Sequence, residues 1–209
     1  MPIKEKEWIV THNKENVYKA YEKIASWMDE HRNRTLFEKP YLDHVISYLQ
    51  PGGTVLDLGC GTGEPLGQYF IDAGFQVTGV DGSKKMLEIA KERCPTIKFI
   101  LSDMRVLDLK ERFDGIVAWH SFFHLPPDNQ KAMFPIFVSH LKPGGVLLFT
   151  SGPEEGEVWS DNGGENLYHA SLSPEQYKNL LTQHGFKLID HKACDPECQG
   201  ATVWLAKLV

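Results

Sequence analysis

Apolar residues fall in short runs along most of the chain, and these runs alternate with segments in which apolar residues recur at helical spacing. The runs predict strands at 54–58, 75–80, 97–101, 113–119 and 145–150. The helical spacing predicts helices at about 64–73, 83–93, 128–141 and 174–184. Such an alternation is typical of a parallel sheet with helices on both faces. Two last strands, near 186–192 and 201–208, have no helix between them and predict a terminal hairpin.

The residues before this alternating region are predicted to be helical. Apolar and aromatic residues between Val17 and Met28 recur at helical spacing and predict an amphipathic helix near 14–30. A second helix is predicted near 40–49, where Pro51-Gly52-Gly53 stops it. We therefore expect one domain over 1–209, with a helical cap at 1–50 and an α/β core at 51–209. Pro135, inside the helix predicted at 128–141, predicts a kink or two shorter helices.

The stretch from Val55 to Gly63 carries the clearest chemical signal. An apolar run ends in Asp57, and glycines then stand at 59, 61 and 63. Glycine permits positive φ and a close approach of a ligand to the backbone, and the N–H groups of a following helix start can hold an anion. Asp81 ends the next apolar run, about 20 residues on, where a ribose-binding carboxylate lies in nucleotide-binding βαβ units. A nucleoside-type cofactor is predicted.

The glycine spacing indicates which cofactor. The dinucleotide fingerprint is G-x-G-x-x-G, whereas this chain has G-x-G-x-G with an acid two residues before it. That pattern resembles motif I of the class I S-adenosylmethionine (SAM) dependent methyltransferases. Further landmarks of that family resemble segments of this chain in the same order, namely Val80–Ser83, Leu101–Met104, Phe113–Trp119 and Leu141–Phe149. The resemblance covers roughly 40–209.

The resemblance implies a Rossmann-like class I methyltransferase fold. Such a fold has a mostly parallel seven-stranded sheet, a terminal antiparallel strand and helices on both faces. It also implies SAM as cofactor, with amides of the 59–63 turn at its carboxylate end and Asp57 facing its ammonium group. Asp81 would accept both ribose hydroxyls, Asp103 would accept from the adenine amino group, and the Met104 amide would donate to the ring.

A segment beginning at Tyr21 resembles the "YDxIAxxYD" sequence that precedes motif I in small-molecule methyltransferases. The predicted cofactor-binding residues are Asp57, Gly59, Cys60, Gly61, Gly63, Asp81, Gly82, Ser83, Met86, Ser102, Asp103, Met104, Trp119, Tyr21 and Trp27. Ser83 is also a plausible helix N-cap. Three alternatives stay open: Cys60 as a small residue in a tight loop, Met86 as core packing, and the Tyr21 helix as one that only packs on the sheet.

The methyl acceptor is expected at the carboxyl ends of the strands. His120 follows the fourth strand and, with His169, is a candidate catalytic residue; His124 is expected to be structural. The stretch from Ser151 to Ser171 is interpreted as a mobile lid, with a solvated acidic loop or a short hairpin as the alternative. Tyr168 or His169 and the turn 194–200 are expected to contact the acceptor. No Asn-Pro-Pro-Tyr or Asp-Pro-Pro-Tyr segment follows the fourth strand, which argues against adenine or glutamine amino groups as acceptors.

Composition narrows the class of protein. Hydrophobic content of 42% and charged content of 24% are ordinary for a globular protein, and a net charge of −6 argues against general nucleic-acid binding. No apolar run reaches the roughly 18 residues of a membrane helix, and the N-terminus lacks the apolar core of a signal peptide, so a cytoplasmic protein is expected. Four cysteines are then expected to be reduced. They lack zinc-site spacing, and no metal is expected.

The function predicted is therefore methyl transfer from SAM to a small-molecule acceptor by in-line displacement, in a monomer or homodimer that binds neither nucleic acid nor membrane. The alternative is a non-catalytic SAM-binding protein that serves as a sensor or partner subunit. An NAD(P)-dependent oxidoreductase is disfavoured by the glycine spacing.

Overall fold

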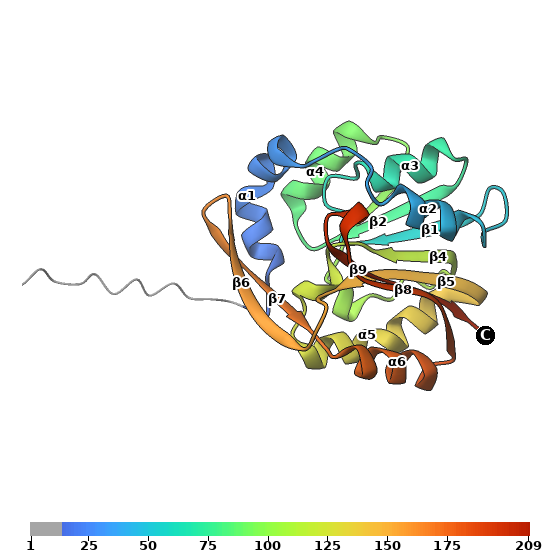
Figure 1. Ribbon diagram of the computed structural model, residues 1–209. Helices are drawn as coiled ribbons and strands as arrows, with labels where there is room; N and C mark the ends of the chain where they lie inside the picture. Colours follow the sequence, from blue (N-terminus) through green and yellow to red (C-terminus); the bar gives the residue numbers. More distant parts are fainter. Residues whose placement is uncertain (1–13) are drawn as a thin grey trace, which may run out of the picture.

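The computed structural model describes residues 14–209, in which seven strands form one sheet (Figure 1). Its strands are β1 Thr54–Leu58, β2 Gln76–Asp81, β3 Lys98–Leu101, β4 Phe113–Ala118, β5 Leu141–Ser151, β8 Phe186–Asp195 and β9 Ala201–Leu208. The order is β3-β2-β1-β4-β5-β9-β8, and only β9 runs against its neighbours. This confirms the predicted mostly parallel sheet with a terminal antiparallel strand.

Helices cover both faces of the sheet, as predicted (Figure 1). They are α1 Tyr18–His31, α2 Lys39–Ile46, α3 Leu66–Asp72, α4 Lys84–Arg93, α5 Pro127–His140 and α6 Pro174–Gln183, with short 3₁₀ turns η1 Met104–Val106, η2 Phe122–His124 and η3 Pro196–Cys198. In Figure 1, α2, α3 and α4 lie on one side of the sheet, and α5 and α6 lie on the other. None of the helices within 14–209 is long and apolar enough to cross a membrane.

Of the two outcomes expected at Pro135, a kink or two shorter helices, the second is wrong. Residues 127–140 form the single helix α5, with Pro135 inside it. Pro135 is exposed on the outer side of α5, so water can solvate the carbonyl group that its missing N–H leaves without a partner.

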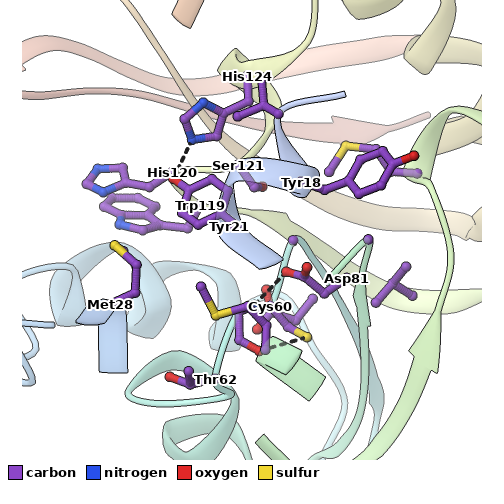
Figure 2. Close-up of a pocket in the computed structure, with 18 of the residues that line it drawn as sticks. Tyr18, Tyr21, Met28, Cys60, Thr62, Asp81, Trp119, His120, Ser121 and His124 are labelled. Carbon is purple, nitrogen blue, oxygen red and sulfur yellow. Dashed lines mark hydrogen bonds between the residues drawn. The ribbon is translucent and has the colours of Figure 1, made fainter. Parts of the chain in front are cut away.

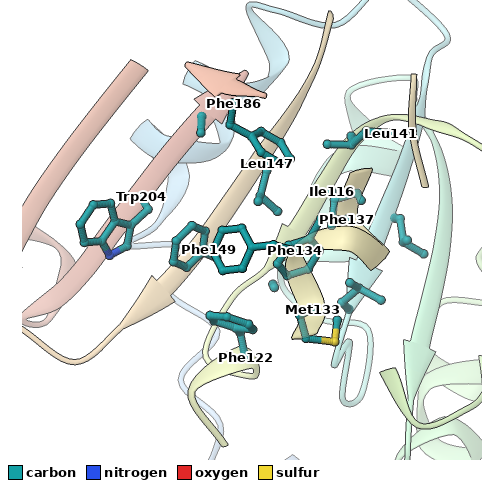
Figure 3. Close-up of a cluster of buried hydrophobic side chains, with 14 of the residues drawn as sticks. Ile116, Phe122, Met133, Phe134, Phe137, Leu141, Leu147, Phe149, Phe186 and Trp204 are labelled. Atoms are coloured by element: carbon teal, nitrogen blue, oxygen red, sulfur yellow. The ribbon is translucent and has the colours of Figure 1, made fainter. Parts of the chain in front are cut away.

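Aromatic packing holds α5 and α6 to the sheet. Phe122, Phe134, Phe149 and Trp204 are fully buried together, and Figure 3 shows their rings between α5 and the strands. Phe149 and Trp204 come from the neighbouring strands β5 and β9, and their rings stack at 5.9 Å. A second cluster buries α2 and α3 against the opposite face. Because both faces are packed, the strand ends are held in fixed positions.

The segment 151–171 is not the irregular loop expected of a lid. It contains the antiparallel strands β6 Gly156–Asn162 and β7 Glu165–Ser171, joined by Gly163 and Gly164 with φ of 60° and 84°. The hairpin alternative is therefore correct.

The hairpin packs on α1, and α1 packs on α4. Leu167 and Ala170 of β7 lie in one buried cluster with Ile24 of α1. On its other side, α1 reaches α4 through Glu22, which accepts a hydrogen bond from the Ser83 hydroxyl at 2.6 Å. In Figure 1, α1 and the hairpin lie together at one end of the sheet. They line the same cavity as the carboxyl ends of β1, β2 and β4, and so form its roof.

Candidate functional site

A cavity of about 290 Å³ opens at the carboxyl ends of the parallel strands. Its floor comes from the residues that follow β1, β2, β3 and β4, and its roof comes from α1 and β7. Figure 2 shows Asp81 and Cys60 at one side of it, and Trp119 with His120 at the other. Parallel α/β sheets bind ligands at this edge.

The glycine loop lies directly against the loop that follows β4. Gly59 has φ of +76°, and a Cβ there would lie 2.2 Å from the Cβ of Ser121. Both the backbone conformation and the lack of space therefore exclude a larger residue. The Ser121 hydroxyl donates to the Leu58 carbonyl and fixes the two loops together. Gly61 has φ of +55°, and a Cβ there would meet no atom within 4 Å. The backbone at Gly61 is therefore open to a ligand.

Asp81 holds this loop from the end of β2. One carboxylate oxygen accepts from the Gly61 N–H at 2.9 Å, and the other accepts from the Ser83 N–H at 2.8 Å. Burial raises the pKa of Asp81, and these backbone hydrogen bonds oppose the rise. Each carboxylate oxygen has two acceptor positions, so the carboxylate can still accept from a ligand in the cavity.

Asp103 lies at the next strand end and is paired with Arg105. Arg105 donates to it through Nε at 3.0 Å and through the backbone N–H at 2.9 Å. Burial favours the neutral acid, but the hydrogen bonds from Arg105 outweigh it and keep the pKa of Asp103 low. Asp103 is thus a charged acceptor at the β3 side of the cavity.

Asp57, Arg32 and Thr62 form a polar group that the sequence predicted only in part. Asp57 is 5% exposed; burial raises its pKa to about 7, while the charge of Arg32 opposes the rise. Nε of Arg32 and Oγ1 of Thr62 are both buried without a hydrogen-bond partner among residues 14–209. All three residues line the cavity, so a carboxyl group, a guanidinium cation and a hydroxyl group there can bind a ligand.

His124 ties the roof to the floor. Its Nδ1 lies 2.7 Å from the Tyr168 carbonyl oxygen, which can only accept, so Nδ1 carries the proton. Burial lowers the pKa of His124 to about 3, so the ring is neutral and Nε2 is an acceptor. The hydroxyl group of Tyr21, on α1, donates a hydrogen bond to that Nε2 at 2.8 Å. The expected structural role of His124 agrees with these contacts.

Replacing Tyr21 with Phe should therefore destabilise the fold. The buried His124 Nε2 would lose its donor, and an unsatisfied buried acceptor costs about 1–3 kcal/mol. Chemical denaturation measures this loss, and Tyr48→Phe, at a half-exposed tyrosine outside the cavity, serves as the control. Equal stability of the two variants would show that the Tyr21–His124 bond does not hold α1 in place.

His120 stands at the end of β4 in a strained backbone conformation. Its φ is +49°, which is uncommon outside glycine, and its N–H donates to Thr150 Oγ1 at 2.9 Å. Its ring stacks on Trp119 with centroids 5.4 Å apart and is exposed to the cavity. Desolvation by the cavity walls lowers its pKa to about 4, so the ring is neutral near pH 7.

His169 reaches the same side of the cavity from β7. Its ring stacks on Phe123 at 5.2 Å, and its Nε2 lies 2.9 Å from the Ser160 hydroxyl. Burial lowers its pKa. Successive residues of a strand point to opposite sides, so Tyr168 points away from the cavity and packs against Trp159. Of Tyr168 and His169, the two alternatives expected for contact with the acceptor, only His169 lines the cavity.

The structure brings most of the predicted site residues to one cavity. Those that line it are Asp57, Gly59, Cys60, Gly61, Gly63, Asp81, Gly82, Met86, Ser102, Asp103, Met104, Trp119, Tyr21, His120 and His169. Ser83 is buried as the N-cap of α4, and Trp27 stacks on His31 and packs beside Gly163, so neither lines the cavity. The turn 194–200 does not line it either, and its Asp195 instead accepts from the Tyr41 hydroxyl.

Sequence reasoning missed several lining residues. They are Glu15, Val17, Tyr18, Met28, Arg32, Thr62, Glu64, Leu66, Val80, Arg105, Ser121, Phe123, Leu125, Asn162 and Leu167. Thr62 lies inside the glycine motif and could have been included from its position. Within residues 14–209 no group of three or more His, Cys, Asp or Glu side chains could hold a metal ion.

A family model described as a methyltransferase domain matches residues 55–145. This range runs from β1 into β5 and contains the glycine loop, Asp81, Asp103 and His120. The matched residues are thus the ones that build the floor of the cavity.

Curated proteins similar to this chain include two bacterial relatives. Cyclopropane-fatty-acyl-phospholipid synthase of Escherichia coli (strain K12) is 35% identical over 113 residues, or 53% of this chain and 29% of that protein. The putative methyltransferase YqeM of Bacillus subtilis (strain 168) is 32% identical over 139 residues, or 62% of this chain and 54% of that protein. The chain therefore spans about half the length, or less, of these relatives.

Solved structures extend the likeness to the whole fold. The 1,6-didemethyltoxoflavin-N1-methyltransferase of Burkholderia thailandensis has a TM-score of 0.72 and 18% identity, over 100% of this chain and 92% of that protein. At this identity the likeness concerns the fold. The motifs, the family model over residues 55–145 and the fold agree with one another, and the chain is similar to the class I SAM-dependent methyltransferases.

Proposed function

We propose that the protein transfers a methyl group from SAM to a small-molecule acceptor. The observation that carries this proposal is the pairing of two kinds of polar groups in one cavity. Asp81 and Asp103 are acceptors suited to the hydroxyls and amino group of adenosine. Asp57 with Arg32 and Thr62 suits an amino-acid zwitterion. A molecule that joins adenosine to an amino acid satisfies both sets, and SAM is such a molecule.

The zwitterion would satisfy the groups that the protein leaves unpaired. Its ammonium group would face Asp57 and favour the ionised carboxylate, as an opposite charge does at short range. Its carboxylate would accept from Arg32 Nε and Thr62 Oγ1, the two cavity-lining side-chain atoms that are buried without a partner within residues 14–209. The open backbone at Gly61 would let the ligand approach this loop closely.

The residues of the chain would bind the cofactor, orient the acceptor and take the acceptor's proton. When bound, SAM supplies the methyl group on a positively charged sulfur, whose leaving group is a neutral thioether. The roof of α1 and β7 covers the cavity, and the ring-lined side would hold the acceptor beside the cofactor. His120 and His169 are neutral near pH 7 and would take the proton of an acceptor that carries one.

Labelled SAM tests the activity directly. Incubation of the protein with methyl-labelled SAM and a panel of metabolites should transfer label to a small molecule. Calorimetry with SAM, S-adenosylhomocysteine and NAD should show binding of the first two. Binding without transfer to any member of the panel would favour a non-catalytic sensor or partner subunit, and binding of NAD alone would overturn the cofactor assignment.

SAM affinity should rise with pH and level off above about pH 7. The pKa of Asp57 is about 7 in the free cavity, and a bound ammonium group would lower it, so binding releases a proton below that pH. Affinity should fall by at most about tenfold per pH unit as the pH drops below 7. Calorimetry between about pH 5.5 and 8 measures this, and Asp57→Asn should bind more weakly with a flatter pH profile. Equal slopes in the two proteins would assign the titration to another group.

A further inference from the structure

Four rings form a continuous surface on the acceptor side of the cavity. Trp119 and His120 stack at 5.4 Å, His120 and Phe123 lie 5.8 Å apart, and Phe123 stacks with His169 at 5.2 Å. Three of these rings follow β4 directly, and the fourth comes from β7. We refer to Trp119, His120, Phe123 and His169 as the aromatic wall. Figure 2 shows the first two with their ring planes together at the edge of the pocket.

The aromatic wall carries no charge near pH 7. Burial lowers the pKa of both His120 and His169, so both rings are neutral. The acids that line the cavity lie elsewhere. Glu64 is paired with Arg34 and Arg93, and Glu15 and Asp103 lie beside Arg105.

The two other lining acids, Asp57 and Asp81, belong to the proposed cofactor side. The charged or titratable groups that act on His120 or are acted on by it are Arg32, which follows α1, His169 from β7 and the neutral His124 from η2. The charge of Arg32 acts on both Asp57 and His120, and under the proposed function the carboxylate of SAM pairs with it. With SAM bound, a charged acceptor would therefore meet no free counter-charge at the wall, and burying an unpaired charge is strongly unfavourable.

His120 is the member of the wall that is free to accept a proton. Its backbone N–H bonds Thr150, but its ring nitrogens bond no side chain or carbonyl within residues 14–209. His169 differs, because its Nε2 is occupied by Ser160. The positive φ of His120 holds its ring over Trp119 and open to the cavity, and strained residues of this kind cluster at functional sites.

We propose that the aromatic wall binds an uncharged, planar aromatic acceptor with a weakly acidic O–H or ring N–H, and that His120 takes its proton. The proposal rests on the proposed methyl transfer. The acceptor's oxygen or nitrogen uses a lone pair to form the bond to the methyl carbon, as the S–CH₃ bond breaks and its electron pair stays on sulfur. The acceptor's proton passes to a ring nitrogen of His120 and then to solvent.

Matched naphthalenes test the substrate class. With S-adenosylhomocysteine present, 1-naphthol should bind at least about tenfold more tightly than 1-naphthoate or phosphoethanolamine, since only it avoids burying an unpaired charge. Phe123→Leu should weaken the binding of 1-naphthol roughly 2- to 12-fold, because it removes one aromatic ring on which the ligand stacks. Phe37→Leu, at an exposed phenylalanine outside the cavity, should leave it unchanged. Tighter binding of 1-naphthoate or phosphoethanolamine would overturn the proposal.

The role of His120 is tested by the pH profile of methyl transfer to 1-naphthol. In the native protein kcat/KM should be nearly flat between about pH 6.5 and 8, because the base is already neutral. In His120→Gln only the ionised naphthol reacts, so kcat/KM should be lower and rise roughly tenfold per pH unit. His44→Gln, on α2 outside the cavity, should behave as the native protein does. Identical profiles for native protein and His120→Gln would remove the proton-accepting role.

A titration with S-adenosylhomocysteine alone separates the two levels of the argument. If the native protein does not bind it, the proposed function itself fails. If it binds S-adenosylhomocysteine but not 1-naphthol, the cofactor assignment stands and the proposed acceptor class is wrong.

Discussion

Asp81→Ala should weaken SAM binding by roughly 10- to 150-fold. Under the proposed function, the Asp81 carboxylate accepts from both ribose hydroxyls, and hydrogen bonds to a charged group are worth about 1.5–3 kcal/mol. The structure adds a second reason for the loss. Asp81 also accepts from the Gly61 N–H at 2.9 Å, so its removal frees the loop that faces the cofactor. Calorimetry with SAM measures the change.

Asp72→Ala is the matched control for this variant. Asp72 ends α3 on the exposed surface and does not line the cavity, so its replacement should leave SAM affinity unchanged. A folded Asp81→Ala protein that binds SAM as tightly as the native protein would contradict the ribose assignment. If Asp81→Ala weakens the binding of adenosine but not that of free methionine, the lost contact lies at the nucleoside end of the cofactor.

The floor of the cavity could be predicted because it depends on strand ends. In a parallel sheet the carboxyl ends of neighbouring strands meet at one edge, so acids that close successive apolar runs must converge. Asp57, Asp81 and Asp103 each lie within two residues of the carboxyl end of a strand, and the structure brings all three to the cavity. The positive φ of Gly59, Gly61 and Gly63 likewise agrees with the role that their spacing predicted.

The roof could not be predicted in the same way, because it depends on contacts between distant segments. Trp27 and Tyr21 lie on the same helix, yet only Tyr21 faces the cavity, and Trp27 packs beside Gly163 of the hairpin. Arg32 follows the last residue of α1, in a polar stretch of the sequence with several cations, and nothing local distinguishes it from them. Which cation faces the cavity depends on how α1 docks.

The hairpin itself did leave a signal in the sequence. Two adjacent glycines between two short segments are a recognised sign of a two-residue hairpin turn, because that turn needs positive φ at both positions. Gly163 and Gly164 have that conformation. The glycines and acids of the segment favoured flexibility in the sequence-based interpretation. In the strand β7, His169 lies on the side of the cavity, and its neighbour Tyr168 lies buried on the opposite side.

Gly61→Val should abolish measurable SAM binding while the protein stays folded. The valine side chain would project into open space at the cavity wall, where the cofactor is proposed to approach the backbone. Its φ of +55° is also poorly tolerated by a β-branched residue, at a cost on the order of 1–3 kcal/mol. Gly200→Val separates the two effects, because Gly200 has φ of +77° and open space around it but lies outside the cavity. Denaturation should show similar losses of stability in both variants, whereas calorimetry should show lost SAM binding only in Gly61→Val. Gly61→Val binding within a few-fold of the native affinity would show that this loop does not hold the cofactor.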